Sequence, residues 1–340
     1  MEIFKKIDNF LKCAGYDKLF ISFFPMFCSL VLAAGTFTFN YKFACYLTVA
    51  FVLLHLSIKI FDDFIDWIKG KPYNRMELEK TGVRGLYLKC SHFIENKTLP
   101  RFYFYCAFTF LFFSVFIIFS VCCMSKIYCA LLFLLIIPFF ALLNYKEKYS
   151  KIILFTGYEI FPAMICSFLS MFFIFWVSTR CITSTLFYIS IISFFSTLNI
   201  FYTSSLLNQK ADIISEKKTL PIIIKNENLQ FIFSSFLTLF PFILVGIGIF
   251  YDFLPKLSEI TILLIPFSIW FLYLIYLFIK KPQQTVKWHF LMGFDGNRDC
   301  NEQNNLSWYF VRYNFLRNIF ISFYMLLSIS FINFKELFMF

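Results

Sequence analysis

The sequence predicts an all-α protein, a polytopic membrane bundle of nine transmembrane helices around one central cavity. Two observations lead to this prediction. Hydrophobic residues make up 60% of the chain and its mean hydropathy is +0.73, far above what a soluble domain of 340 residues requires. The apolar residues also gather in long runs that could each cross a bilayer. We therefore expect a single integral membrane domain over residues 1–340.

The apolar runs give the expected helices in chain order. A helix rises about 1.5 Å per residue, so about 20 apolar residues cross the roughly 30 Å hydrocarbon layer of a bilayer. The predicted spans are 19–38, 43–61, 102–123, 127–144, 153–177, 183–206, 229–251, 259–279 and 313–334. Pro25, Pro162 and Pro241 fall inside these runs, which is compatible with membrane helices because neighbouring groups satisfy the freed carbonyls.

Lysine and arginine are distributed unevenly between alternate loops. The loops on one side of the predicted membrane hold 24 of them and those on the other side hold five. Basic residues concentrate in cytoplasmic loops, so the N-terminus is predicted to be cytoplasmic. With nine helices the C-terminus would then lie on the opposite side. This asymmetry accounts for the net charge of +11 without a nucleic-acid partner.

Cysteine and histidine do not indicate a metal site or a disulfide framework. Most of the eleven cysteines lie inside apolar runs, no C-x-x-C pair occurs, and the three histidines are far apart in the sequence. Cysteines in this setting behave as small apolar side chains.

Two clusters of acidic and amide residues close apolar runs on the predicted cytoplasmic side. They are Asp62, Asp63 and Asp66 after the second run, and Asn208, Asp212 and Glu216 after the sixth. On a helix, residues four positions apart share a face, where like charges repel each other. A divalent cation between two such faces would remove the repulsion, and oxygen ligands suit Mg²⁺. The alternative is two solvated helix ends with incidental acids.

These motifs resemble those of the UbiA superfamily of intramembrane prenyltransferases. The first family motif, N-D-x-x-D, corresponds to Asp62-Asp63-Phe64-Ile65-Asp66, followed by Lys69-Gly70 and Arg75. The second, N-x-x-x-D-x-x-x-D before Lys-x-Thr-Leu-Pro, corresponds to Asn208, Asp212, Glu216 and Lys218-Thr219-Leu220-Pro221. Asp62 replaces the family's asparagine, and Glu216 replaces its commoner aspartate. Gly157-Tyr158-Glu159 is similar to the Gly-x-Glu of quinone-type members such as dihydroxynaphthoate prenyltransferases.

The resemblance implies transfer of an isoprenoid group from its diphosphate to an acceptor, expected to be an aromatic or quinone precursor, by Mg²⁺-assisted ionisation. The implied metal ligands are Asp62, Asp63, Asp66, Asp212 and Glu216. Of these, Asp63, Asp66, Asp212 and Glu216 are the implied catalytic residues. The residues implied to contact the diphosphate are Lys69, Arg75, Asn208 and Lys218. The expected partners are an isoprenyl diphosphate and the lipid bilayer.

Two alternatives follow from the same residues. A membrane terpene cyclase would keep the ionisation site and let a double bond of the substrate itself capture the cation. A transporter or lipid-binding protein would perform no chemistry, because charges inside membranes also mark ion pathways. Such a transporter would place its acids near the middle of the bilayer and show inverted repeats. Here the acids lie at helix ends.

Overall fold

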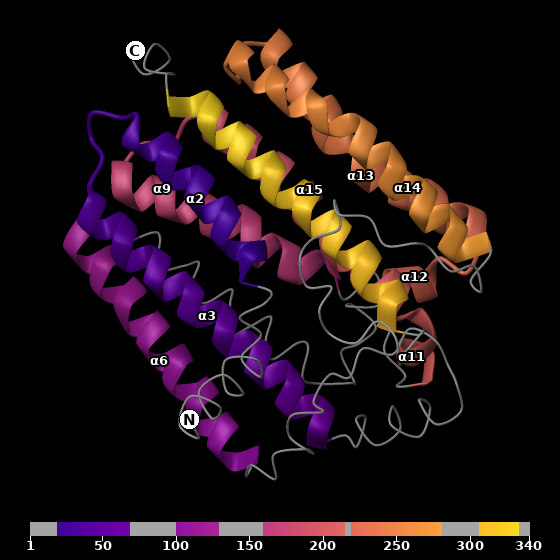
Figure 1. Ribbon diagram of the computed structural model, residues 1–340. Coiled ribbons are helices and arrows are strands. Elements are labelled where there is room, and N and C mark those ends of the chain that lie inside the picture. The colour runs from indigo at the N-terminus through magenta and orange to yellow at the C-terminus, as the bar shows by residue number, and fades with distance from the viewer. Residues whose placement is uncertain (1–18, 69–99, 129–158, 215–218, 281–305, 333–340) are drawn as a thin grey trace, which may run out of the picture.

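The computed structural model describes residues 19–68, 100–128, 159–214, 219–280 and 306–332, and within these ranges the regular structure is helical, with no strand. The elements are α2 (Phe20–Ala34), α3 (Tyr41–Ile68), α6 (Pro100–Ser125), the π-helix η4 (Met164–Leu169), α9 (Ser170–Thr179), α10 (Ser184–Leu207), α11 (Gln209–Ile214), α12 (Leu220–Ile223), α13 (Glu227–Phe250), the 3₁₀-helix η5 (Lys256–Leu264), α14 (Ile265–Lys280) and α15 (Leu306–Ile332) (Figure 1).

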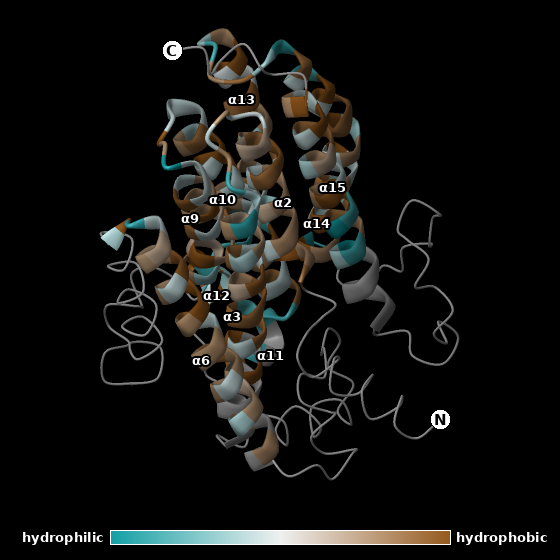
Figure 2. Cartoon of the chain, turned by 90° about the vertical axis from the view of Figure 1, so that its left-hand side faces the viewer, coloured by the Kyte–Doolittle hydropathy of each residue, from teal (hydrophilic) through white to brown (hydrophobic). Residues whose placement is uncertain are grey.

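The prediction of a membrane bundle is confirmed. Seven helical segments are long and apolar enough to cross a membrane, and the shorter apolar helix α2 brings the described total to eight. Each coincides with one of the predicted spans. Apolar residues dominate these helices along their length (Figure 2). The predicted span at 127–144 lies outside the described residues, so the count of nine stays a prediction. The protein is an integral, multi-pass membrane protein.

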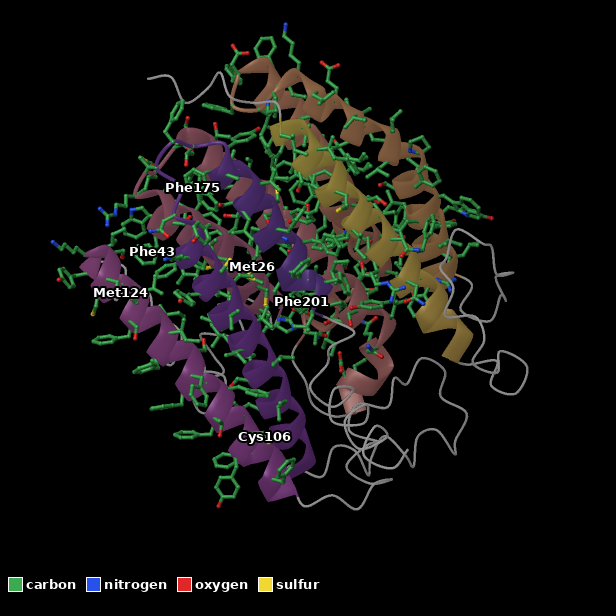
Figure 3. All side chains as sticks on the ribbon, turned by 60° about the vertical axis from the view of Figure 1, so that its left-hand side comes forward. Met26, Phe43, Cys106, Met124, Phe175 and Phe201 are labelled. Carbon is green, nitrogen blue, oxygen red and sulfur yellow. The ribbon has the colours of Figure 1, made fainter. Side chains whose placement is uncertain are left out.

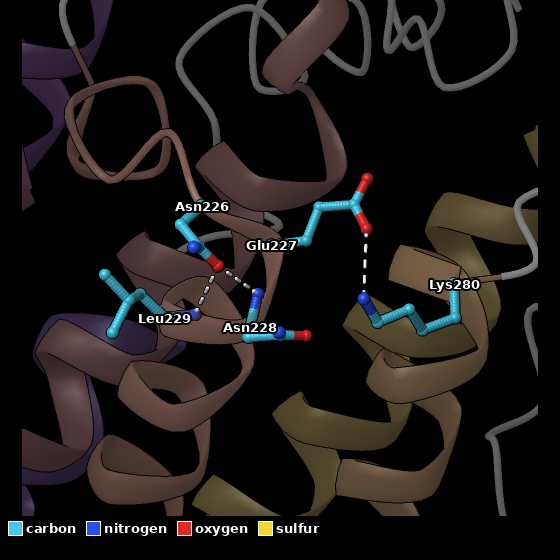
Figure 4. A network of polar contacts seen from close by, with 5 residues as sticks. All are labelled: Asn226, Glu227, Asn228, Leu229 and Lys280. Atoms are coloured by element: carbon cyan, nitrogen blue, oxygen red, sulfur yellow. Dashed lines mark hydrogen bonds and ion pairs between the residues drawn. The ribbon is translucent and has the colours of Figure 1, made fainter.

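Side chains just before three of the long helices explain where these helices begin. Asn40 accepts hydrogen bonds from the backbone N–H groups of residues 42 and 43 at 3.1 and 3.2 Å, before α3. Thr183 accepts one from Leu186 at 3.1 Å, before α10. Asn226 accepts from residues 228 and 229 at 2.8 and 3.3 Å, before α13 (Figure 4). Each cap satisfies N–H groups that the first turn of a helix leaves without a partner.

Helix α2 lies at the centre of the bundle and joins its two apolar cores. It packs against α9 on one side and α15 on the other (Figure 1). Met26, labelled in Figure 3, is fully buried and belongs to the core made with α3, α6 and α9. Cys28 and Leu32 belong to the larger core made with α10, α13, α14 and α15. The apolar faces of one helix therefore connect the two halves of the molecule.

Helix α6 presents a row of aromatic side chains to its surroundings. The row is formed by Phe102, Phe108, Phe112, Phe116 and Phe119, each more than half exposed. In Figure 3 the aromatic side chains of this helix project away from the bundle. An apolar surface of this extent is unusual on a soluble monomer but suits contact with lipid chains. We therefore interpret this side of α6 as facing the bilayer.

Candidate active site at the ends of α3 and α10

The first acidic motif lies on the last turns of α3. The helix continues through Ile68, so the predicted helical conformation of residues 62–66 is confirmed. Residues 62 and 66 are therefore four positions apart on one continuous helix and share a face. The side chains of Asp62, Asp63 and Asp66 lie outside the described part of the structure. Their common orientation toward a metal stays a prediction.

The second motif begins where α10 ends. Asn208 follows the last residue of α10, and the backbone N–H of Asp212 donates to the carbonyl of Asn208 at 2.9 Å. This bond is the i to i+4 contact of a helical turn, so the predicted spacing of these two residues is confirmed. The Asn208 amide donates to the Ser204 carbonyl at 2.8 Å. Asp212 is only 6% exposed.

A second buried carboxylate lies beside the second motif. Glu159 is 1% exposed, and both of its oxygens accept from the backbone N–H of Leu220, at 3.1 and 3.0 Å. It also accepts a hydrogen bond from the Ser205 side chain and is close enough to Asp212 for their charges to interact. The two carboxylates thus occupy one polar region between the end of α10 and the start of α12.

The carbonyl of Pro221 is held by two glutamine side chains. Gln209 of α11 donates to it at 3.1 Å, and Gln230 of α13 donates to it at 2.7 Å. The Gln230 side chain also donates to the Ile224 carbonyl at 2.7 Å, while the backbone carbonyl of Gln230 accepts from the Tyr202 hydroxyl at 3.0 Å. The segment that follows the second motif is therefore fastened to α10, α11 and α13.

The structure brings the two motifs to the same end of the bundle. In Figure 1, α11 lies at the lower end, where α3 also finishes, and Figure 2 agrees. Carboxylate oxygens are the donors that Mg²⁺ prefers, so Asp212 and the aspartates on the last turns of α3 have the chemistry to hold such an ion. Within the described residues, no group of three or more histidine, cysteine, aspartate or glutamate side chains forms a metal cluster. Lys69, Arg75, Glu216 and Lys218 lie outside the described residues.

One basic residue was placed wrongly by the sequence. Arg312 directly precedes the predicted span at 313–334, so the sequence predicts it to be a cytoplasmic loop residue, but it lies inside α15 and is fully buried. Its Nε donates to the carbonyl of Leu274 at 3.0 Å, and its guanidinium carbon lies 5.6 Å from the centre of the Phe278 ring. Gln230 was also overlooked. The signal that could have found it is an amide inside an otherwise apolar run, since such groups require partners in a membrane.

Comparison with known proteins identifies the architecture. No family model and no curated protein sequence matches the chain. Among solved structures, a digeranylgeranylglyceryl phosphate synthase matches with a TM-score of 0.56 and 15% identity, over 96% of this chain and 99% of its own. A UbiA homologue from Archaeoglobus fulgidus bound to GPP and Mg²⁺ matches with a TM-score of 0.55 and 14% identity, over 95% of this chain and 99% of its own. A UbiA homologue from the same organism bound to DMAPP and Mg²⁺ matches with a TM-score of 0.54 and 14% identity, over 95% of this chain and 99% of its own. The chain therefore has the fold of the UbiA homologues.

Proposed function

We propose that this protein is a UbiA-type intramembrane prenyltransferase, which transfers an isoprenoid group from its diphosphate to an acceptor. The observation that carries the proposal is the position of Asp212. It is buried, in helical spacing with Asn208, and lies at the end of the bundle where the Asp62–Asp66 turn lies. Proteins of the same fold are bound to GPP or DMAPP together with Mg²⁺.

In this proposal the two motifs hold the head of the substrate. The first metal would be held by Asp62, Asp63 and Asp66, and the second by Asp212 and Glu216. Bound Mg²⁺ would neutralise the charge that develops on the departing diphosphate. The diphosphate would be contacted by Lys69, Arg75, Asn208 and Lys218. Cationic side chains near departing diphosphate oxygens stabilise the developing charge.

The reaction breaks the bond between the allylic carbon and the diphosphate oxygen and forms a bond from that carbon to the acceptor. The bonding electrons leave with the diphosphate, and the acceptor loses a proton. We propose an aromatic or quinone-precursor acceptor because Gly157-Tyr158-Glu159 resembles the pattern of quinone-type members. The isoprenoid tail would enter from the bilayer, since the apolar surface of the protein faces lipid.

We further propose that the N-terminus is cytoplasmic and the C-terminus lies on the other side. This orientation rests on the 24-to-five distribution of basic residues between alternate loops. It would place both acidic motifs at the cytoplasmic surface, where a water-soluble diphosphate head can reach them.

The proposal is tested with the purified protein in liposomes, supplied with Mg²⁺, DMAPP or GPP, and a panel of aromatic acids. We expect diphosphate release that requires Mg²⁺ and stops with a chelator, together with a prenylated acceptor found by mass spectrometry. Release without any acceptor, accompanied by a cyclic hydrocarbon, would indicate a terpene cyclase instead. No release with any substrate would remove the enzyme assignment and favour a transporter or a lipid-binding protein.

A further inference from the structure

We infer that Glu159 is a positioning residue for the second acidic motif rather than a residue that contacts the acceptor. The inference rests on the proposed function and assigns a role to a residue outside both motifs. Glu159 is 1% exposed, and both carboxylate oxygens are directed at one backbone N–H, that of Leu220. A carboxylate buried and engaged in this way is directed at the protein's own backbone and not at a substrate.

The local sequence explains why a carboxylate from another helix is needed here. Leu220 begins α12, and Pro221 follows it without an N–H group to donate. Thr219 stands at the N-cap of α12, and among the residues that the structure describes its buried hydroxyl makes no capping bond and no other hydrogen bond. Leu220 is the first residue of α12, so no carbonyl of its own helix accepts from its N–H, and this partly buried donor needs an acceptor from elsewhere. Glu159 supplies that acceptor for the Leu220 N–H.

Direct contacts connect this anchor to Asp212. Glu159 holds the N–H of Leu220, and the next residue, Pro221, presents its carbonyl to Gln209 at 3.1 Å. Gln209 is the first residue of α11, the six-residue helix that contains Asp212. A displacement of Leu220 is therefore transmitted to α11 through a single hydrogen bond. Gln230, which donates to the same Pro221 carbonyl at 2.7 Å, fixes this segment from α13.

The arrangement also explains how two carboxylates can lie close together in a buried region. Glu159 and Asp212 interact electrostatically, and like charges favour separation. The Leu220 N–H and the Ser205 side chain both donate to Glu159, so the oxygens of Glu159 are directed at these donors, and we assign the cation contact to Asp212 of the second motif. Ligand groups need placement to within about 0.5 Å for function, and supporting contacts provide it.

The test compares Glu159→Ala, Glu159→Gln and Gln230→Leu with the parent protein. Glu227→Ala is the matched control, because Glu227 is an exposed acid whose contact is an ion pair with Lys280 at 3.2 Å (Figure 4). The first measurement is the Mg²⁺ concentration that half-saturates turnover of the isoprenyl diphosphate. The second is the rise in unfolding temperature caused by Mg²⁺ with inorganic diphosphate, which needs no turnover.

We expect Glu159→Ala to raise the half-saturating Mg²⁺ concentration about 10-fold to 100-fold, the usual range when a group supporting a metal ligand is lost. The thermal shift caused by Mg²⁺ and diphosphate should shrink to match. Glu159→Gln keeps one oxygen for the Leu220 N–H and should stay near the parent value. Gln230→Leu should shift the Mg²⁺ dependence in the same direction as Glu159→Ala, because it loosens the same segment. Glu227→Ala should behave as the parent.

Three results would overturn the inference. One is an unchanged Mg²⁺ dependence in Glu159→Ala with a raised KM for the acceptor, which would make Glu159 an acceptor contact. Another is an equal rise of the half-saturating Mg²⁺ concentration in Glu159→Gln and Glu159→Ala. That result would show that the charge of Glu159 matters and its hydrogen bond to Leu220 does not. The third, which applies even if Glu159→Ala does not fold, is a normal Mg²⁺ dependence in Gln230→Leu. A parent protein without Mg²⁺-dependent turnover would instead contradict the proposed function itself.

Discussion

Replacing Asp212 by asparagine should separate activity from stability. The substitution keeps the size of the side chain and removes its charge. Asp212 is 6% exposed and interacts with the charge of Glu159, which is itself buried. Asparagine keeps the hydrogen-bonding capacity of the side chain and removes one of two neighbouring like charges, so the folded state should stay close in stability to that of the parent protein. The same change removes a charge that the proposed reaction requires.

The expected loss of activity can be estimated from the burial of the site. Two opposite unit charges about 4 Å apart attract by about 4 kcal/mol at an effective dielectric constant of about 20. If most of that attraction acts on the transition state, the barrier rises by about 3 kcal/mol, which corresponds to a rate loss of roughly a hundredfold or more. Salt should screen this effect only weakly, because the Asp212 side chain is almost fully covered by protein.

The assay measures diphosphate release in liposomes and thermal unfolding in detergent on the same preparations. Asp252→Asn is the matched control, since Asp252 is exposed and lies just after the C-terminal end of α13. Its backbone φ is 57°, a conformation that asparagine tolerates. We expect normal unfolding with strongly reduced release for Asp212→Asn, and parent values for Asp252→Asn. Full activity in Asp212→Asn would refute the assignment of Asp212 to the active site. Loss of folding together with activity would make Asp212 part of a structural network.

Three further predictions concern other parts of the chain. In the first motif, Asp62→Asn should be tolerated because the family motif that this stretch resembles has asparagine at that position, whereas Asp63→Asn should reduce the rate about a hundredfold. The reverse order of these two rates would refute the alignment of the motif. A reporter fused after Lys256 should be active only on the non-cytoplasmic side, and a cytoplasmic signal would contradict the predicted topology. In α13, Gly248→Ala should lower stability by about 1–3 kcal/mol, because its added Cβ would lie 2.6 Å from a Tyr188 carbon and 2.8 Å from a Leu254 carbon. Gly246→Ala meets nothing within 4 Å and should unfold like the parent; equal unfolding temperatures for the two variants would contradict this packing.

The helical class, the membrane spans within the described residues and the helical conformation of the motifs could all be predicted from the sequence. These properties follow from short-range physics. A run of about 20 apolar residues leaves water as a helix whatever its neighbours are, because only a helix satisfies its own backbone in lipid. The same locality explains why the helical spacing of Asn208 and Asp212 could be predicted, since a bond between residues four apart requires no other part of the chain.

The sequence was least informative about polar residues inside apolar runs. It placed Arg312 in a loop because a positive charge usually marks the end of a membrane span. The structure instead buries Arg312 in α15, with the Leu274 carbonyl and the Phe278 ring as neighbours from α14. Those neighbours precede it by more than 30 residues in the chain, so no local pattern could have indicated them.

Which polar groups lie together at the candidate site could not be predicted from the sequence and became apparent from the assembled fold. The contact of Glu159 with Leu220 joins residues 61 positions apart, so the short sequence pattern around Glu159 could not have indicated it. Lipid chains are as apolar as the helix surfaces, so hydrophobicity alone does not choose which faces of membrane helices pack together. Hydrogen bonds between helices and the fit of side chains make that choice, and both depend on the assembled fold.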